Sequence, residues 1–118
     1  MNRSNHIGTF AFTILAATML KSPAVARQQA TDDARKLVEE RTEKLRPFEI
    51  ATGLAWWKAN ISGKDEDFRA KEEAENRLNE ALADPLAFRK LKQAKERGTD
   101  DPVVARAIEV LYLAALEK

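Results

Sequence analysis

The sequence predicts an all-α protein of about four helices, and three observations indicate this class. Ala, Leu, Glu, Lys and Arg dominate the 118 residues, whereas β-branched residues are sparse, as is typical of helical chains. Apolar residues recur at spacings of three and four, which is the period of a helix. Asp-Pro occurs at Asp84-Pro85 and again at Asp101-Pro102, and a capping Asp before Pro favours the start of a helix.

The first 26 residues have the regions of a secretory signal peptide. Arg3 provides the positive charge, Thr9 to Leu20 form an uncharged and mostly apolar run, and Ser22-Pro23 breaks that run. The run is shorter than the roughly 20 apolar residues of a spanning helix, so we expect no stable membrane span.

The small residues Ala24 and Ala26 stand where a signal peptidase accepts them, at the −3 and −1 positions of a cleavage site. We therefore expect residues 1–26 to be a cleaved signal peptide. The remaining helical region, 27–118, would be exported to the periplasm or out of the cell.

The exported region lacks two side chains on which much enzyme chemistry depends. The chain has no Cys, and its one His is His6, inside the signal. Catalytic zinc usually needs His or Cys ligands, and a Ser-His-Asp triad needs its imidazole base. We therefore expect no catalytic, metal-binding or cofactor-binding residue. Without Arg3 and Lys21, the 20 basic residues become 18 against 19 acidic ones, a balance that indicates no nucleic-acid partner.

The first helix is predicted to begin near Thr31-Asp32-Asp33, because these are N-cap residue types. It should be long and kinked or broken near Pro47, at Leu45-Arg46, since proline removes a backbone donor and crowds the preceding turn. Asn60 to Gly63 should end it. After Pro47, apolar residues form one stripe at helical spacing: Ile50, Leu54, Trp57 and Ile61.

The second helix, over about 64–83, is predicted to be mostly solvated. Its apolar residues are few, and carboxylates such as Glu72, Glu73, Glu75 and Glu80 alternate with basic residues. We expect a narrow apolar seam and stabilising pairs such as Glu73–Arg77.

The third helix should begin at Asp84-Pro85 and end at Gly98, with Leu86, Phe88, Leu91 and Ala94 facing inward. The fourth, over 102–116, is apolar around most of its circumference and so requires partners on several sides. No stop signal closes it before the last two residues. We expect this chain to be an incomplete part of a larger helical fold, or to self-associate through 102–116.

Trp56-Trp57 is the most conspicuous motif. Adjacent helical residues point about 100° apart, so we expect one Trp in the core and the other at an edge. Asn60-Ile61-Ser62 matches a glycosylation pattern, but a helix-terminating Asn60 and a capping Ser62 are the preferred interpretation. Trp56, Trp57 and Asn60 are thus candidates for packing rather than catalysis.

Several segments resemble the N-terminal helices of angiotensin-converting-enzyme-like peptidyl-dipeptidases, including the bacterial members. The similar segments are Lys44 to Ala51, Ala55 to Ser62, Lys71 to Ala74 and 101–118. The resemblance implies an all-α metallopeptidase that removes dipeptides from peptide C-termini. In that family, His-Glu-x-x-His and a downstream Glu hold zinc, and the first helices form a lid over a deep cleft.

None of those zinc ligands has a counterpart in this chain. What the resemblance transfers is the lid role, to the helices within 32–83, and we expect a peptide substrate only in a full-length relative. The alternative is a small exported helical binding or adaptor protein that is complete as it stands.

Overall fold

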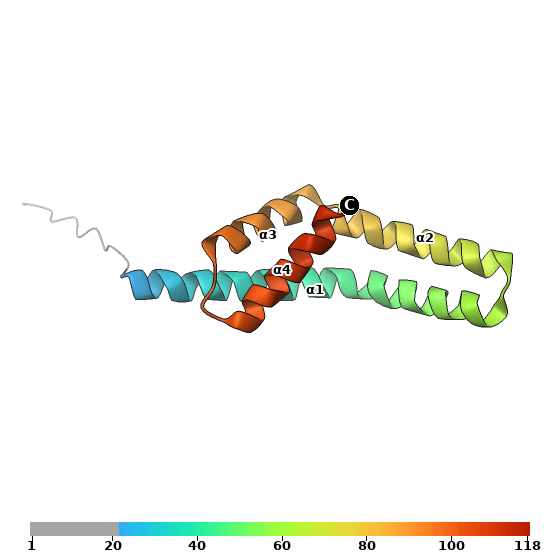
Figure 1. Ribbon diagram of the computed structural model, residues 1–118, viewed down its shortest axis with the longest axis horizontal. Helices are drawn as coiled ribbons and strands as arrows, with labels where there is room; N and C mark the ends of the chain where they lie inside the picture. Colours follow the sequence, from blue (N-terminus) through green and yellow to red (C-terminus); the bar gives the residue numbers. More distant parts are fainter. Residues whose placement is uncertain (1–21) are drawn as a thin grey trace, which may run out of the picture.

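A computed structural model describes residues 22–118, of which 89% are helical and none lies in a strand (Figure 1). The four helices are α1 (Pro23–Ser62), α2 (Asp65–Leu82), α3 (Pro85–Arg97) and α4 (Pro102–Leu116). The predicted all-α class with about four helices is therefore confirmed for this part of the chain. The apolar run of the predicted signal peptide lies outside the described residues.

Helix α1 begins earlier than predicted. Ser22 is its N-cap, since the Ser22 hydroxyl accepts a hydrogen bond from the Val25 amide at 3.4 Å, and Pro23 occupies the first turn. The predicted start at Thr31 is wrong, because Ser followed by Pro is itself a start signal. Ala24 and Ala26 lie in the first turns of α1 and are exposed.

The predicted break at Leu45-Arg46 is absent, and α1 continues through Pro47 to Ser62. Pro47 cannot donate to the carbonyl of Glu43, but it lies on the exposed side, where water can satisfy that carbonyl. Leu45 is fully buried and anchors the helix on its other side.

Helices α1 and α2 form an antiparallel hairpin joined by a short turn at Gly63 (Figure 1). Gly63 has φ +63°, the left-handed conformation that ends many helices, and its amide donates to the carbonyl of Ala59. The side of α1 that faces α2 repeats at spacings of three and four, as in a coiled coil. We call these positions the seam: Leu45, Phe48, Thr52, Ala55 and Ala59.

Most side chains on the α2 side of the hairpin are polar, as predicted. Ala74 and Asp67 are the buried residues of α2, and Thr52 donates to the Ala74 carbonyl at 3.2 Å. The ion pair between two residues of α2 is Lys71–Glu75 at 3.0 Å, four positions apart, and not the predicted Glu73–Arg77.

Helices α3 and α4 pack against the N-terminal half of α1 and enclose a small core. Five buried residues form it: Ala34, Leu91, Val104, Ile108 and Ala115. The Phe88 and Tyr112 rings stack beside it, with centroids 5.4 Å apart. Of the residues predicted to face inward on α3, Leu91, Phe88 and Ala94 do so. Leu86 does not, because Ala87 takes the buried position and turns Leu86 outward.

The outer face of α4 stays exposed, as expected for a helix whose apolar residues cover more than one side. We call this set the α4 outer face: Val103, Val110, Leu113 and Leu116. None of the four helices in residues 22–118 combines the length and the apolar content of a membrane-spanning segment.

Candidate interaction surface

The apolar stripe of α1 is the most prominent exposed feature of the described residues. Its four side chains keep 55% (Ile50), 65% (Leu54), 61% (Trp57) and 68% (Ile61) of their surface exposed. Trp56 is 51% exposed as well. The prediction that one Trp lies in the core is therefore wrong. Monomeric proteins rarely expose a row of large apolar side chains of this kind, and such a surface usually marks an interaction site.

The stripe lies on the side of α1 that is opposite to α2. Each stripe residue follows a seam residue by two positions: Ile50 follows Phe48, Leu54 follows Thr52, Trp57 follows Ala55, and Ile61 follows Ala59. Two residues turn a helix by about 200°. Because α2 occupies the seam, it covers none of the stripe, and the larger apolar side chains face outward.

A polar cluster holds the tip of the hairpin. Lys58 Nζ lies 2.8 Å from Asp67 Oδ1, and Ser62 donates to Asp67 Oδ2 at 2.6 Å. These hydrogen bonds hold the pKa of Asp67 below its usual 3.8, and the Asp67 carboxylate raises the pKa of Lys58. The cluster therefore joins the start of α2 to the last turns of α1.

The predicted end of the first helix at Asn60 to Gly63 is confirmed. Ser62 accepts from the Lys64 amide at 3.2 Å, but the predicted capping role is wrong, because Gly63 is the C-cap of α1 and Lys64 is the N-cap of α2. Asn60 Nδ2 donates to the Trp56 carbonyl at 2.7 Å, one turn back in the same helix. Ser62 therefore bonds a backbone group of the turn, whereas Asn60 bonds one within α1.

A second polar cluster joins α1 to the start of α3. Arg41, which is buried, donates to the Ala81 carbonyl at 3.1 Å and lies 3.8 Å from Asp84 Oδ2. Asp84 caps α3 through the Leu86 and Ala87 amides, and Lys44 reaches it at 3.1 Å. Lys44 and the Ala87 amide lower the pKa of Asp84. Sequence reasoning missed this role of Arg41; the signal that could have found it is a cation spaced with Ala34 and Leu45 on the same face of the helix.

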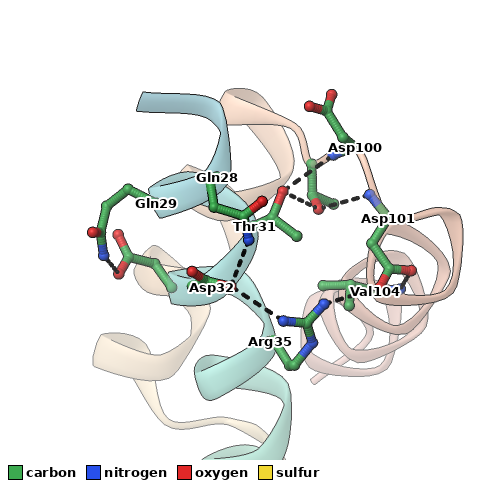
Figure 2. A network of polar contacts seen from close by, with 10 residues as sticks. Gln28, Gln29, Thr31, Asp32, Arg35, Asp100, Asp101 and Val104 are labelled. Atoms are coloured by element: carbon green, nitrogen blue, oxygen red, sulfur yellow. Dashed lines mark hydrogen bonds and ion pairs between the residues drawn. The ribbon is translucent and has the colours of Figure 1, made fainter. Parts of the chain in front are cut away.

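A third cluster, drawn in Figure 2, ties the α3–α4 loop to α1. The buried Thr31 hydroxyl accepts from the Asp100 amide at 3.3 Å and lies 3.1 Å from Thr99 Oγ1. Arg35 donates to Asp101 at 3.1 Å, while Asp101 caps α4. The Val104 amide and Arg35 lower the pKa of Asp101. Asp101 thus has the capping role that the sequence predicts.

The acidic residues of α2 do not converge. Glu72, Glu73 and Glu80 are exposed and Glu75 is half-buried. Within residues 22–118, no three metal-binding side chains come together. A shallow groove of about 250 Å³ runs between α1 and α3, lined by residues such as Leu37, Lys90 and Ala94. It is smaller and more polar than most small-molecule sites.

No family model matches the chain, and neither does any curated protein or solved structure. The geometry defines the class of protein to which the described residues belong: an α-hairpin scaffold whose longest helix carries an exposed apolar stripe.

Proposed function

We propose that this chain is the N-terminal lid region of an exported zinc metallopeptidase of the peptidyl-dipeptidase type and is not catalytic by itself. The resemblance over residues 31–118 supports the family. The observation that carries the lid role is the extended α1–α2 hairpin, which projects past the α3–α4 pair (Figure 1). The polar contacts that α3, α4 and their loops make to α1 lie between Thr31 and Lys44, so the outer part of the hairpin is an arm.

Such an arm can cover a cleft without contributing to the chemistry in it. Lids limit access and exclude water while the residues of the enzyme body carry out the reaction. In this proposal the α4 outer face packs against that body, because it is the exposed apolar surface beside the α3–α4 core.

In this proposal the residues of the enzyme body, and not those of this chain, bind the zinc ion. The described residues do not fit the ion, since no three metal-binding side chains converge and the exported region has neither His nor Cys. The residues of this chain therefore orient and shield, and no step of peptide hydrolysis is assigned to them.

The first test reads the nucleotide sequence that follows the codon for Lys118. We expect a reading frame that encodes His-Glu-x-x-His. The second test expresses the tagged full chain in its own organism and identifies what it captures. We expect a protein with that motif, bound zinc, and chelator-sensitive release of dipeptides from a blocked peptide.

Substitutions on α4 test whether the α4 outer face is the surface that contacts the peptidase body. Val110→Asp combined with Leu113→Asp should abolish capture of the peptidase, whereas Gln93→Asp, on the exposed side of α3, should leave it unchanged. If no such frame exists and no such protein is captured, the lid proposal is wrong.

The second candidate is a helical binding or adaptor protein, which the exposed stripe on α1 favours. Capture from the native organism separates the two candidates, because a folded chain with a defined oligomer is compatible with both. A captured protein that carries His-Glu-x-x-His supports the lid, whereas capture of a protein without that motif supports the adaptor.

A further inference from the structure

We propose that the α1 stripe binds the same stripe of a second copy, with the two α1 helices antiparallel, to form a two-fold symmetric dimer. The proposal goes beyond the lid role and does not depend on it. Four observations support this occupant: the spacing of the stripe, the charges at its ends, its area, and a glycine on its flank.

The spacing of the stripe is the same in both directions. From Ile50 the next apolar residues follow after four, three and four positions, and from Ile61 backwards the intervals are again four, three and four. A two-fold interface requires a patch that is complementary to itself. In the antiparallel alignment Ile50 meets Ile61 of the second copy and Leu54 meets Trp57, so every stripe residue has an apolar partner. These are the contacts of an antiparallel coiled coil.

The charges at the two ends favour the antiparallel orientation. Glu43 and Arg46 precede the stripe, and the hairpin tip that follows it carries Lys64 and Asp65. An antiparallel dimer brings Glu43 and Arg46 of each copy near Lys64 and Asp65 of the other, so both signs find an opposite. A parallel dimer would set Arg46 beside Arg46 and Glu43 beside Glu43, which is unfavourable. All four residues are exposed.

The area of the stripe is sufficient. From their exposed fractions, the four side chains present a surface on the order of 500 Å² per copy, the size of patches that mark interaction sites. Complete burial of both stripes would remove on the order of 1,000 Å² from water, which is the threshold for a specific interface and fits a weak dimer once the polar rim is added.

Gly53 lies on the flank of the stripe, between Ile50 and Leu54. A Cβ there would meet nothing within 4 Å, so no contact inside the described chain accounts for a glycine in the middle of a helix. A missing side chain at the edge of the stripe lets a second helix approach closely. The α4 outer face offers no equivalent, because Arg106 interrupts it between Val103 and Val110.

The first experiment measures the mass of the purified full chain in solution by light scattering and sedimentation. We expect a dimer at micromolar concentration. Leu54→Lys should weaken it at least tenfold in Kd, whereas Val103→Lys, which places the same charge on an apolar residue outside the stripe that is at least as exposed, should not. Circular dichroism should show unchanged helix content in both variants, since neither residue is buried.

The second experiment determines the orientation and uses the absence of cysteine from the chain. We expect Ile50→Cys of one copy to form a disulfide with Ile61→Cys of another, while neither variant cross-links with itself. A monomer at every concentration, a Leu54→Lys variant that dimerises normally, or a 50–50 disulfide would each overturn the proposal. The lid proposal is tested separately, because a monomeric Leu54→Lys chain should still capture the peptidase through the α4 outer face.

Discussion

Lys58 and Asp67 form the ion pair that joins the end of α1 to the start of α2, with 2.8 Å between Lys58 Nζ and Asp67 Oδ1. Asp67 is nearly buried although it belongs to the first turn of a mostly solvated helix. A carboxylate in the first turn also suits the positive end of the helix dipole. The hairpin tip therefore depends on a charged residue in a buried position.

The pH dependence of stability should reveal this pair. Because the folded protein lowers the pKa of Asp67 below its usual 3.8, the stabilisation is present above about pH 4 and is lost as the pH falls through the lowered pKa. Asp67→Asn should lower the melting temperature at neutral pH and reduce its fall on acidification. Asp84 and Asp101, whose pKa values are also lowered, should supply the remaining fall.

Circular dichroism melts from neutral to acidic pH measure this effect. Glu72→Gln is the control, because Glu72 is exposed and makes no ion pair in the described residues. If the curves of the Asp67→Asn variant and the unaltered chain run parallel, the lowered pKa of Asp67 does not contribute to stability.

The small core should make truncation at Leu91 costly. Leu91 is 1% exposed and is enclosed by α1 and α4, so Leu91→Ala should lower the free energy of unfolding by about 2–5 kcal/mol. Leu86→Ala, on the same helix at 54% exposure, should change it by less than about 0.5 kcal/mol. Urea titration measures both values, and equal losses would show that α3 does not pack as described.

The contribution of the α4 cap to stability should be measurable. Asp101 accepts hydrogen bonds from the Val103 and Val104 amides at 2.9 and 3.2 Å, so Asp101→Ala should cost about 1 kcal/mol of unfolding free energy. Asp100→Ala is the matched control, because the Asp100 side chain is exposed and only its backbone amide is bonded to Thr31. An equal loss in the control would assign the effect to net charge rather than to capping.

Substitution by alanine should change stability in opposite directions at Gly53, inside α1, and at Gly63, which ends α1. In the monomeric Leu54→Lys background, Gly53→Ala should stabilise the chain by about 0.5–1 kcal/mol, since alanine favours the helix and its Cβ meets no neighbour within the described residues. Gly63→Ala should destabilise it by about 1 kcal/mol or more, because φ is +63° there. Thermal melts compare the two variants, and a stabilising Gly63→Ala would contradict the left-handed turn.

Local chemistry made the starts of α3 and α4 predictable. An Asp side chain reaches the first free amides of a helix wherever Pro follows it, whatever lies elsewhere in the fold. Ser22-Pro23 carries the same signal, and the competing interpretation as the end of a signal peptide concealed it. The predicted break at Leu45-Arg46 was wrong for a different reason. The effect of Pro47 on the helix depends on whether water can reach the Glu43 carbonyl, and this is a property of the packed structure.

The orientation of Trp56 and Trp57 could not be predicted from periodicity. Two stripes on α1 have helical spacing, one through Phe48 and Ala59 and one through Ile50 and Ile61. Apolar content favours the second, yet α2 packs against the first, because its own small residues such as Ala74 allow the two backbones to approach closely. The choice of face is therefore a property of the pair of helices and not of either sequence.

The buried Arg41 has a consequence for how uniquely the hairpin is aligned. The outer part of the seam consists of the small residues Thr52, Ala55 and Ala59, and by itself it would tolerate a slide of α2 along α1 by a whole heptad with little loss of apolar contact. Arg41 opposes such a slide, because its buried guanidinium donates to the Ala81 carbonyl through Nη2 and lies 3.8 Å from the Asp84 carboxylate, while its Nε and Nη1 have no hydrogen-bond partner among the described residues. Shifted alignments would leave a buried cation uncompensated, so one arginine excludes them at the expense of some stability.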